Sequence, residues 1–476
     1  MAITLNSRSD FTLENCRRVA WGGESVVIGE AAKAKMAKAR TGFIELVAQP
    51  DITIYGVNTG YGHHAKQRLD AAAQQKHAAA PTFHRAASWG DALPERVVRA
   101  MVFARLTNFI EGHAAISPSV AAKVAAMLDG GPLPPVPARG QGGAGEIMSL
   151  SHLFCMLPED TEIGPKDMLS LLNGSPAASA LIADHSLAAN GRLQIAAEVF
   201  ALAAEAFNAP HGHFAAELEG YWNNPHDAKA LSLLRSLMGP GHGGARRPYQ
   251  APVSIRILPR VLGEAFRAAA VAEEIARQSL VAVTDNPVVI PEGERLGNDP
   301  VISTGGYHNM QAVSAMDGLV AAYTNLAVLA GRIAAKLQDG PVSLLPPFLG
   351  FADGRSYLGV LPMAIVGYEE EMRMLAQPTL LPGSESGGFG QDDVASPVFL
   401  AWSKLERAGL LLDQTLATLA PIAIRAFDVT GRAAPDALNE LAALTAQHFP
   451  DKENNAPFGE GIADLAEAFR TLIYGP

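Results

Sequence analysis

A glycine-rich turn near the start of the chain, Tyr55-Gly-Val-Asn-Thr-Gly60-Tyr-Gly62, places a tyrosine where it could do chemistry. Three glycines in eight residues let the backbone take positive φ values and bend tightly. Such a bend can hold the Tyr55 hydroxyl over a pocket. A tyrosine accepts a proton only if its pKa falls below the free value of about 10. The plainer alternative is a strand over residues 52–55 that ends in a turn, with Tyr55 as a core residue.

A second glycine-rich segment reads Gly140-Gln-Gly-Gly-Ala-Gly145-Glu-Ile-Met-Ser-Leu-Ser-His152. Its first six residues match the dinucleotide-binding pattern GxGxxG, which requires a strand before it and a helix after it. The preceding run, Pro132-Leu-Pro-Pro-Val-Pro137, has four prolines in six positions and cannot form a central strand. A flexible turn that opens a helix is the other plain interpretation.

The segment also resembles the active-site loop of the histidine and aromatic amino-acid ammonia-lyase family. In that family an internal Ala-Ser-Gly cyclises and loses water, which gives an electrophilic methylidene-imidazolone (MIO). The matching positions here are Gly143, Ala144 and Gly145. The methylidene carbon must come from a side chain that can lose a β-substituent, and Ala144 has neither hydroxyl nor thiol. The resemblance therefore implies a relative without the MIO group, and we expect no cofactor.

Two further segments carry the resemblance. The turn at Tyr55 is similar to the family's Tyr-Gly-x-Asn-Thr-Gly-Phe-Gly, which implies that Tyr55 is the base that removes a proton from the substrate and that Gly60 lines the substrate site. Lys166-Asp-Met-Leu-Ser-Leu-Leu-Asn173-Gly-Ser175 is similar to Lys-Glu-Gly-Leu-Ala-Leu-Ile-Asn-Gly-Thr. Its asparagine implies a catalytic position for Asn173 beside the substrate amine, although Asn-Gly is also a common turn.

A third similar segment is Val253-Ser-Ile-Arg256-Ile-Leu-Pro259, against the family's Tyr-Ser-Leu-Arg-Cys-x-Pro. The resemblance implies that Arg256 binds the substrate carboxylate, a role that suits the planar fork of a guanidinium. Val253 stands where the family has a second active-site tyrosine. Tyr249, four residues upstream, could replace that tyrosine only if the loop shifts.

Three short segments complete the match: Thr284-Asp-Asn286-Pro, Gly305-Gly-Tyr307-His and Gln391-Asp392-Asp393. They imply that Asn286, Tyr307 and Gln391 contact the substrate. Asp392 replaces a catalytic glutamate of the family and is one carbon shorter. The plain alternative for the two aspartates is a solvated loop or a helix N-terminus.

Other departures from the family's motifs also fall on its catalytic residues. The family's Ser-His near residue 82 is absent in register, and Pro81-Thr82 is followed by His84 two residues later. The pairs His63-His64 and His211-Gly-His213 lack an acidic partner at ligand spacing, so we expect no metal site. The resemblance spans about residues 50–400, and the scatter of departures indicates that the electrophile is absent from the natural protein.

The expected fold class is mainly α, a long-helix bundle of the ammonia-lyase (fumarase/aspartase-like) superfamily with a mixed N-terminal active-site region. Apolar residues follow helical spacing from Leu193 to Phe207, and three later stretches do the same, the last from Phe399 to about Leu419. We expect an active-site region over residues 1–190, which holds the loop 140–152, and a helical bundle over 191–476. Alanine-rich helix faces and the resemblance together imply a homotetramer with shared active sites.

Composition narrows the range of partners. The net charge of −11 disfavours nucleic acid and anionic membranes. We expect no apolar run of membrane-spanning length and no signal segment. The two cysteines, Cys16 and Cys155, fit a reducing cytoplasm better than a disulfide framework. The resemblance at Arg256 implies that the partner is a small-molecule carboxylate substrate.

Three functional hypotheses remain open. In the first, the substrate already carries a good amine leaving group such as a quaternary ammonium, and Tyr55 drives an ergothionase-like elimination. In the second, the same groups drive a conjugate addition, cyclisation or isomerisation without amine loss. In the third, the chain is a noncatalytic relative. Aromatic faces or carboxylates around a trimethylammonium group would favour the first, and Tyr61, Tyr307, Glu385, Phe389 and Asp392 are the candidates.

Overall fold

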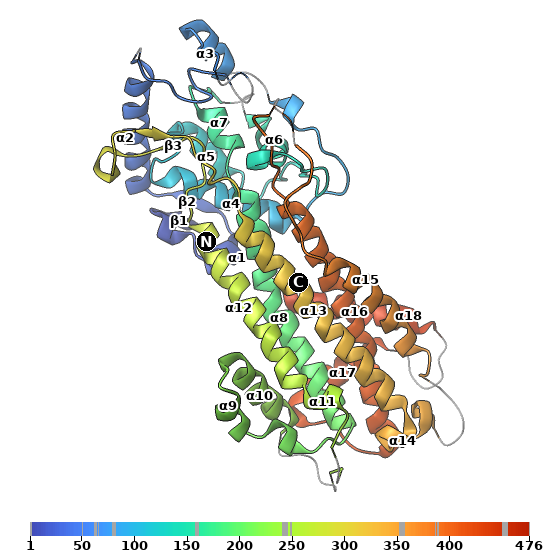
Figure 1. Cartoon of the computed structure of the whole chain (residues 1–476). Coiled ribbons are helices and arrows are strands. Elements are labelled where there is room, and N and C mark those ends of the chain that lie inside the picture. The colour runs from blue at the N-terminus through green and yellow to red at the C-terminus, as the bar shows by residue number, and fades with distance from the viewer. Residues whose placement is uncertain are drawn as a thin grey trace. The chain divides into compact units, whose positions relative to one another are not determined.

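The computed structural model describes residues 2–49, 51–60, 64, 66–78, 82–157, 161–239, 246–247, 250–351, 358–385, 387, 390–449 and 456–475. The chain forms two compact units, each built from three segments (Figure 1). Unit 1 holds Met1–Leu187, Ala272–Met316 and Thr379–Ser403, and unit 2 holds Ala188–Val271, Asp317–Pro378 and Lys404–Pro476. The division expected at residue 190 lies near the first border, but unit 1 also takes in two later segments.

Unit 1 combines short helices with two small sheets. In the first sheet β1 (Ile3–Leu5) pairs in parallel with β2 (Val26–Ile28), and in the second β3 (Val288–Val289) pairs antiparallel with β4 (Val301–Ile302). No strand leads directly into Gly140, since residues 132–139 form only an isolated bridge at Pro137, which excludes the dinucleotide-binding interpretation. The helices that lie wholly in this unit are α1 (Leu13–Ala20), α2 (Glu30–Val47), α3 (Ala71–Ala78), α4 (Glu95–Ile110), α5 (Pro118–Ala126), α6 (Ile147–Phe154) and α7 (Asp167–Leu172).

The described part of unit 2 contains helices and loops but no strand. Four long helices have a segment in each unit: α8 (Pro176–Ala206), α12 (Leu258–Leu280), α13 (Met310–Gln338) and α16 (Val398–Thr430). The last begins one residue before the stretch expected from Phe399 and continues past Leu419 with Pro421 inside it. The remaining helices are α9 (Glu217–Trp222), α10 (Pro225–Met238), α11 (Val253–Arg256), α14 (Gly340–Ser343), α15 (Leu361–Leu375), α17 (Asn439–His448) and α18 (Phe458–Tyr474).

A buried ion pair joins two of these helices inside unit 2. Arg192 of α8 donates from Nε and Nη2 to the two carboxylate oxygens of Asp413 of α16, at 2.8 and 2.9 Å. Glycine at position 409 leaves the space for this arginine, because a Cβ there would lie 2.9 Å from Arg192 Cζ. Two charges that satisfy each other in a bidentate geometry can be buried, whereas either one alone would be costly.

The expectation that no apolar run reaches membrane-spanning length is wrong for two helices. Both α13 and α16 are long and apolar enough to pass that test by composition. However, 67% and 83% of their most apolar windows are buried inside the structure. A lipid-facing helix would leave those side chains exposed, so these are core helices of a folded protein.

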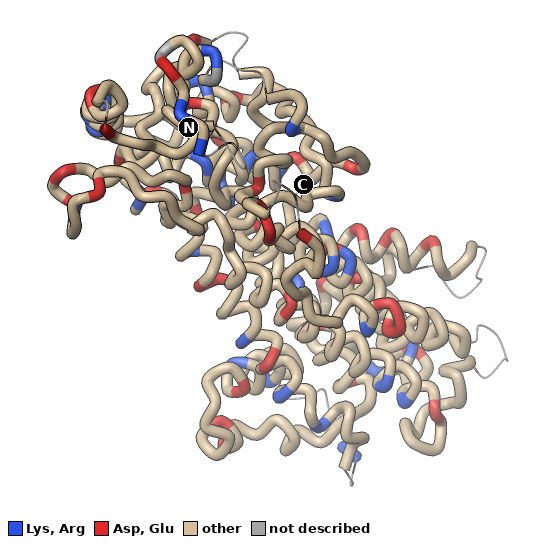
Figure 2. Tube along the Cα trace, turned by 45° about the horizontal axis from the view of Figure 1, so that its top comes forward, with Lys and Arg blue, Asp and Glu red and all other residues tan. Residues whose placement is uncertain are grey.

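Charged residues are distributed along both units rather than gathered on one element (Figure 2). Many pair within one helix, as Arg17 does with Glu14 and Arg267 with Glu264. Exposed pairs of this kind contribute little to stability.

Candidate active site

The loop that resembles the MIO segment bends sharply before α6. Ala144–Glu146 form a short 3-10 turn in which Gly145 and Glu146 have φ values of +65° and +59°. Two backbone hydrogen bonds hold it: Gly174 N–H donates to the Gly145 carbonyl at 3.2 Å, and Ser396 N–H donates to the Gly143 carbonyl at 3.3 Å. The loop is therefore tied to the Asn173 segment and to the segment that follows Asp392.

Asn173 and Tyr307 meet at Gly145. A Cβ built on Gly145 would lie 2.6 Å from Asn173 Oδ1 and 3.5 Å from Tyr307 Cγ, so only glycine fits there. Asn173 is 6% exposed, and no described residue donates a hydrogen bond to its Oδ1. An acceptor buried without a partner is costly, which makes it a candidate contact for a bound ligand. The structure thus brings together three of the positions that the sequence marked.

A buried ionic network lies behind Asn173. Arg105 of α4 donates to the Asn173 carbonyl at 2.7 Å and to Asp285 Oδ1 at 3.3 Å. Lys166 donates to the other oxygen of Asp285 and to the Ala114 carbonyl. The side chains of Arg105, Lys166 and Asp285 are completely buried. Asp285 pairs with both cations, so the network fixes the Asn173 backbone to the Asp285 loop.

Glu146 is the buried acid next to Gly145. Its two carboxylate oxygens accept the N–H groups of Ala177 and Ala178, at 2.6 and 2.8 Å, at the start of α8. Burial raises the pKa of Glu146 to about 8, although these two hydrogen bonds and the positive charge of Arg105 oppose the rise. The side chain anchors the loop to the first turn of a 31-residue helix.

This raised pKa predicts a pH-dependent stability. The ordinary pKa is 4.5, so between pH 4.5 and about 8 the folded protein holds a proton that the unfolded chain has lost. The stabilisation is complete below pH 4.5 and disappears as the pH rises through about 8. We expect the Tm of the wild type to fall more steeply from pH 5 to pH 9 than the Tm of Glu146→Gln, which cannot ionise. Parallel Tm curves in scanning calorimetry would show that Glu146 is ionised throughout.

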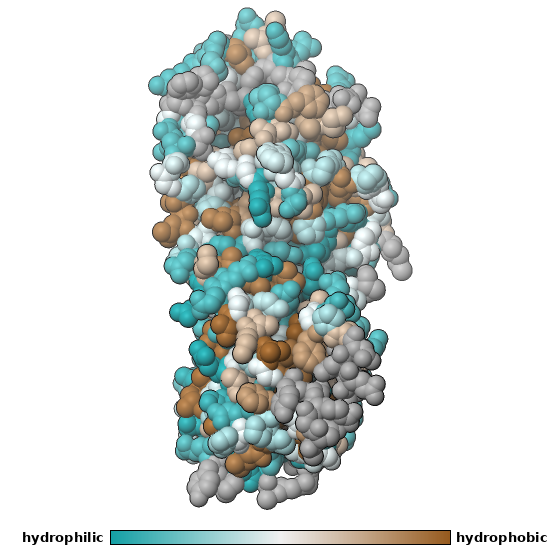
Figure 3. Space-filling view, turned by 90° about the vertical axis from the view of Figure 1, so that its right-hand side faces the viewer, coloured by the Kyte–Doolittle hydropathy of each residue, from teal (hydrophilic) through white to brown (hydrophobic). Residues whose placement is uncertain are grey.

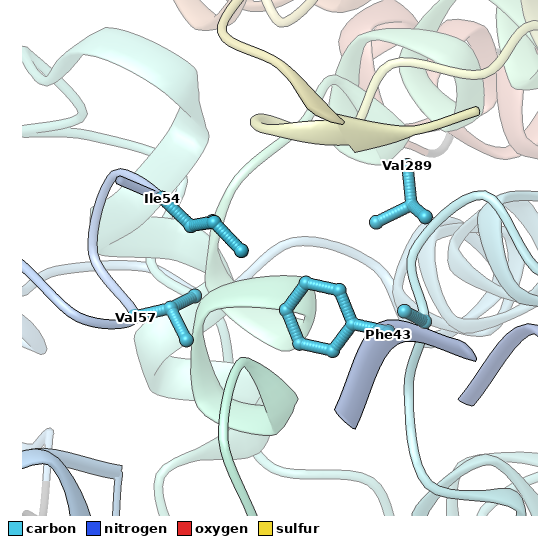
Figure 4. Close-up of a cluster of buried hydrophobic side chains, with 5 residues drawn as sticks. Phe43, Ile54, Val57 and Val289 are labelled. Atoms are coloured by element: carbon cyan, nitrogen blue, oxygen red, sulfur yellow. The ribbon is translucent and has the colours of Figure 1, made fainter. Parts of the chain in front are cut away.

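Apolar packing fixes the turn that carries Tyr55. Ile54 and Val57 contact Phe43 of α2, Ala115 and Val289 of β3 in one buried cluster (Figure 4). No strand forms at residues 52–55, where the chain makes a turn with Gly56 at φ +67°.

The side chain of Asn58 supplies the hydrogen bonds that a strand would have made. Its Oδ1 accepts from Ile54 N–H at 2.7 Å, and its Nδ2 donates to the Ile52 carbonyl at 2.7 Å. Gly60, also expected in the site, packs closely enough on His64 that a Cβ would lie 2.6 Å from the His64 Cβ. Tyr55 itself is half-buried on this rigid turn.

Asn286 holds the segment that leads to Tyr307. Its Oδ1 accepts from Thr304 N–H at 2.9 Å and from Ser303 Oγ at 3.2 Å. This acceptor is therefore used within the protein, where it holds Ser303 and Thr304, four and three residues before Tyr307.

Gln391 and Asp392 come shortly before Ser396, whose N–H donates to the Gly143 carbonyl of the loop 140–152. Gln391 is exposed and Asp392 is half-buried, and Asp392 N–H donates to the Gly387 carbonyl at 3.3 Å. Burial and the neighbouring charge of Asp393 raise the pKa of Asp392. Its carboxyl group is thus less acidic than a solvated aspartate.

Arg256 and Val253 belong to unit 2, on α11. Arg256 Nε donates to the Ala251 carbonyl at 3.1 Å, and its side chain is half-buried. Val253 is 57% exposed, which is unusual for a large apolar side chain. The hydrogen bond to Ala251 fixes one edge of the guanidinium.

Several candidates from the sequence lie outside the described residues: Tyr61, His63, Tyr249 and Phe389. Glu385 is described and exposed, and His84 is exposed on a short 3-10 turn. Within the described chain, no three His, Cys, Asp or Glu side chains converge in a way that could hold a metal ion.

Sequence reasoning missed Arg105, Glu146 and Ser396. A signal for the first was present, since Arg105 interrupts the apolar sequence of α4, in which fourteen consecutive residues from Val97 to Ile110 are buried. A charged residue buried in such a helix requires a counter-charge or several hydrogen-bond acceptors. Its partner, Asp285, lies 180 positions away and could not be named from the sequence.

Comparison with known proteins shows the family of the chain. The aromatic amino acid lyase family model matches residues 11–160 and 157–448. The histidine ammonia-lyase of Deinococcus radiodurans is 30% identical over 422 residues, which cover 81% of this chain and 78% of the relative. That of Anaeromyxobacter dehalogenans is 27% identical over 430 residues, which cover 81% and 82%.

Solved structures share the fold along the whole chain. Ergothionase from Treponema denticola, in complex with desmethyl-ergothioneine sulfonic acid, superposes with a TM-score of 0.89 at 20% identity and full coverage of both chains. Tyrosine aminomutase from Streptomyces globisporus gives 0.85 at 23% identity, covering 100% of this chain and 98% of that one. The expected long-helix fold is confirmed, and the chain belongs to the aromatic amino acid lyase family.

Proposed function

We propose that this chain is an MIO-independent lyase that eliminates a quaternary amine from a substrate with a carboxylate. The observation that carries the proposal is Ala144, whose methyl group has no β-substituent to lose. The loop around it is still held by the hydrogen bonds from Gly174 and Ser396. Gly145 still contacts Asn173 and Tyr307. A chain that had lost all activity would have no need for an unpartnered buried acceptor at that point.

A quaternary amine removes the need for the electrophile. The MIO group of the family makes ammonia a better leaving group, and a trimethylammonium group already leaves as neutral trimethylamine. In the proposed step Tyr55 takes a proton from the carbon next to the C–N bond. The C–H electrons form the new C=C bond, and the C–N pair departs with the amine. The same fold serves ergothioneine degradation in the Treponema denticola enzyme.

Arg256, contributed by another chain of the tetramer proposed below, suits the carboxylate end of such a substrate. Its Nε is occupied by the Ala251 carbonyl, and no hydrogen bond from its two terminal nitrogens joins it to the described chain. Two terminal N–H groups in one plane match the two oxygens of a carboxylate. Tyr307 and Asp392 supply the aromatic face and acidic group that a trimethylammonium requires.

The second candidate is a cyclase or isomerase that works by conjugate addition or proton transfer. The exposed Val253 favours it, because the loss of an aromatic side chain there reshapes the site. The names of the sequence relatives point instead to ordinary histidine deamination.

One assay separates these functions. The wild type and Tyr55→Phe are incubated with histidine betaine, ergothioneine or unmodified L-histidine, and amines and products are followed by proton NMR. We expect trimethylamine and an unsaturated acid from a betaine, and no ammonia from histidine. Ammonia from histidine would identify a conventional ammonia-lyase. A rearranged product without amine release would identify the cyclase or isomerase, and unchanged substrates would favour a noncatalytic relative.

We further propose that the enzyme is a cytoplasmic homotetramer. The face of α15 exposes Met363, Val366 and Met374, at 69%, 53% and 75%, and Figure 3 shows apolar side chains on the surface of the molecule. Exposed apolar faces of this kind mark contacts with other chains. Light scattering at micromolar concentration should give four times the chain mass of 50.0 kDa, and a monodisperse monomer would contradict the prediction.

A further inference from the structure

Within unit 2 the backbone at Ala251 links a histidine to the arginine proposed for substrate binding. Ala251 N–H donates to His213 Nε2 at 3.2 Å, and the Ala251 carbonyl accepts from Arg256 Nε at 3.1 Å. Ala251 is 2% exposed. A single buried residue is thus held on one side by His213 and holds Arg256 on the other.

We propose that His213 is a positioning residue for Arg256, and that it acts only when its imidazole is neutral. This inference rests on the role of Arg256 in the proposed function. A neutral imidazole accepts at one ring nitrogen, whereas a protonated one donates from both. Protonation of His213 therefore turns Nε2 into a donor that faces the N–H of Ala251. The hydrogen bond is lost, and with it the support of the loop that orients the guanidinium.

The surroundings of His213 favour the neutral form. Burial and the positive charge of Arg256 lower its pKa. The other charged groups nearby are already paired. On the same turn, His211 contacts Glu205 of α8, which also binds Arg246.

From α10, Arg235 donates to the Phe214 carbonyl and pairs with Glu219 of α9. Among the described residues, Arg256 is the one whose charge acts on the His213 ring.

Whether carboxylate affinity rises or falls at low pH distinguishes a positioning role of His213 from an effect of its charge alone. If His213 acted only through its charge, protonation would add a positive charge near an anion site and would strengthen carboxylate binding. If it positions Arg256, protonation weakens binding although the site becomes more positive. By linkage, a bound carboxylate then lowers the pKa of His213 further.

The test is calorimetric binding of 3-phenylpropionate, whose only titrating group is its carboxyl, from pH 5 to pH 8.5, with the uncharged 3-phenylpropanamide as the ligand control. This acid has no amine to lose, so binding is measured without turnover. For the wild type we expect affinity to fall about five- to tenfold as His213 becomes protonated, the effect of one hydrogen bond. Arg256→Lys serves as the reference for a weakened carboxylate site at every pH.

Three variants complete the test. His213→Gln keeps an acceptor that cannot titrate, so it should bind as tightly as the wild type at pH 8.5 and show no loss at lower pH. His213→Leu should bind about five- to tenfold more weakly at all pH values. His211→Gln lies on the same turn but has a different partner, and it should keep the wild-type profile.

Each outcome decides for or against the positioning role of His213, the proposed elimination, or both. Stronger binding at low pH in the wild type, or an unchanged profile in His213→Gln, overturns the positioning role. No carboxylate binding to the wild type at any pH overturns it together with the role of Arg256. If the pH profile follows His213 but no betaine is turned over, the inference stands and the proposed elimination fails. If betaines are turned over and His213→Leu binds like the wild type, the elimination stands and the inference fails.

Discussion

Tyr55→Phe should lower turnover of a betaine substrate by about 10²–10⁴-fold, the usual effect of removing a general base. The substitution deletes one hydroxyl and leaves the ring in place. The turn itself is held by Asn58 and by the packing of Ile54 and Val57, none of which involves that hydroxyl. We therefore expect the Tm and the circular dichroism spectrum to stay unchanged while amine release is lost.

Tyr221→Phe is the matched control for this variant. Tyr221 lies on α9 and is 83% exposed, so the same loss of a hydroxyl should leave both activity and stability unaffected. Near wild-type turnover by Tyr55→Phe would show that another group removes the proton.

Arg105→Met should destabilise the protein by about 1–3 kcal/mol, the range for leaving a buried acceptor without its donor. Asp285 would keep its ion pair with Lys166, but the Asn173 carbonyl would lose its donor. We expect a lower Tm together with a loss of activity that persists at temperatures where the variant is fully folded. The second effect follows because Arg105 fixes the backbone of Asn173 beside Gly145.

Arg99→Met in the same helix is the control. Arg99 is also buried, but its guanidinium donates to the carbonyls of Val19, Glu24 and Leu128 and leaves no carboxylate behind. It removes the donor from three carbonyls and should also lower the Tm, but it should leave the activity of the folded protein unchanged. Equal activity losses in the two variants would mean that Arg105 acts only through stability.

The sequence predicted much of the fold because its signals are local. Helical spacing and the order of the short motifs depend on neighbours a few residues apart. The resemblance marked Gly145, Asn173 and Tyr307 as site positions, but the contact of Gly145 with both is visible only in the fold. The role of Asn286 was less accessible, because its amide oxygen is occupied by Ser303 and Thr304. Only the fold reveals which acceptor atoms are already used.

Long-range pairings could not be derived from the sequence. Nothing in the segment around Arg105 names Asp285, and nothing near His213 names Ala251, since each pair is joined only by folding. The histidines at 211 and 213 have the same spacing as many ordinary surface histidines. Their different partners, Glu205 for one and a buried backbone N–H for the other, are what distinguish them.

The most direct test of the account is the mass of the loop that contains Ala144. Intact mass spectrometry, followed by peptide mapping of residues 140–152, measures whether this segment has been modified. Because Ala144 has no group to lose, we predict the unprocessed mass for the whole chain and an unmodified peptide across Gly143, Ala144 and Gly145. A loss of water located at these three residues would contradict the account, because it would show that the electrophile forms despite the alanine.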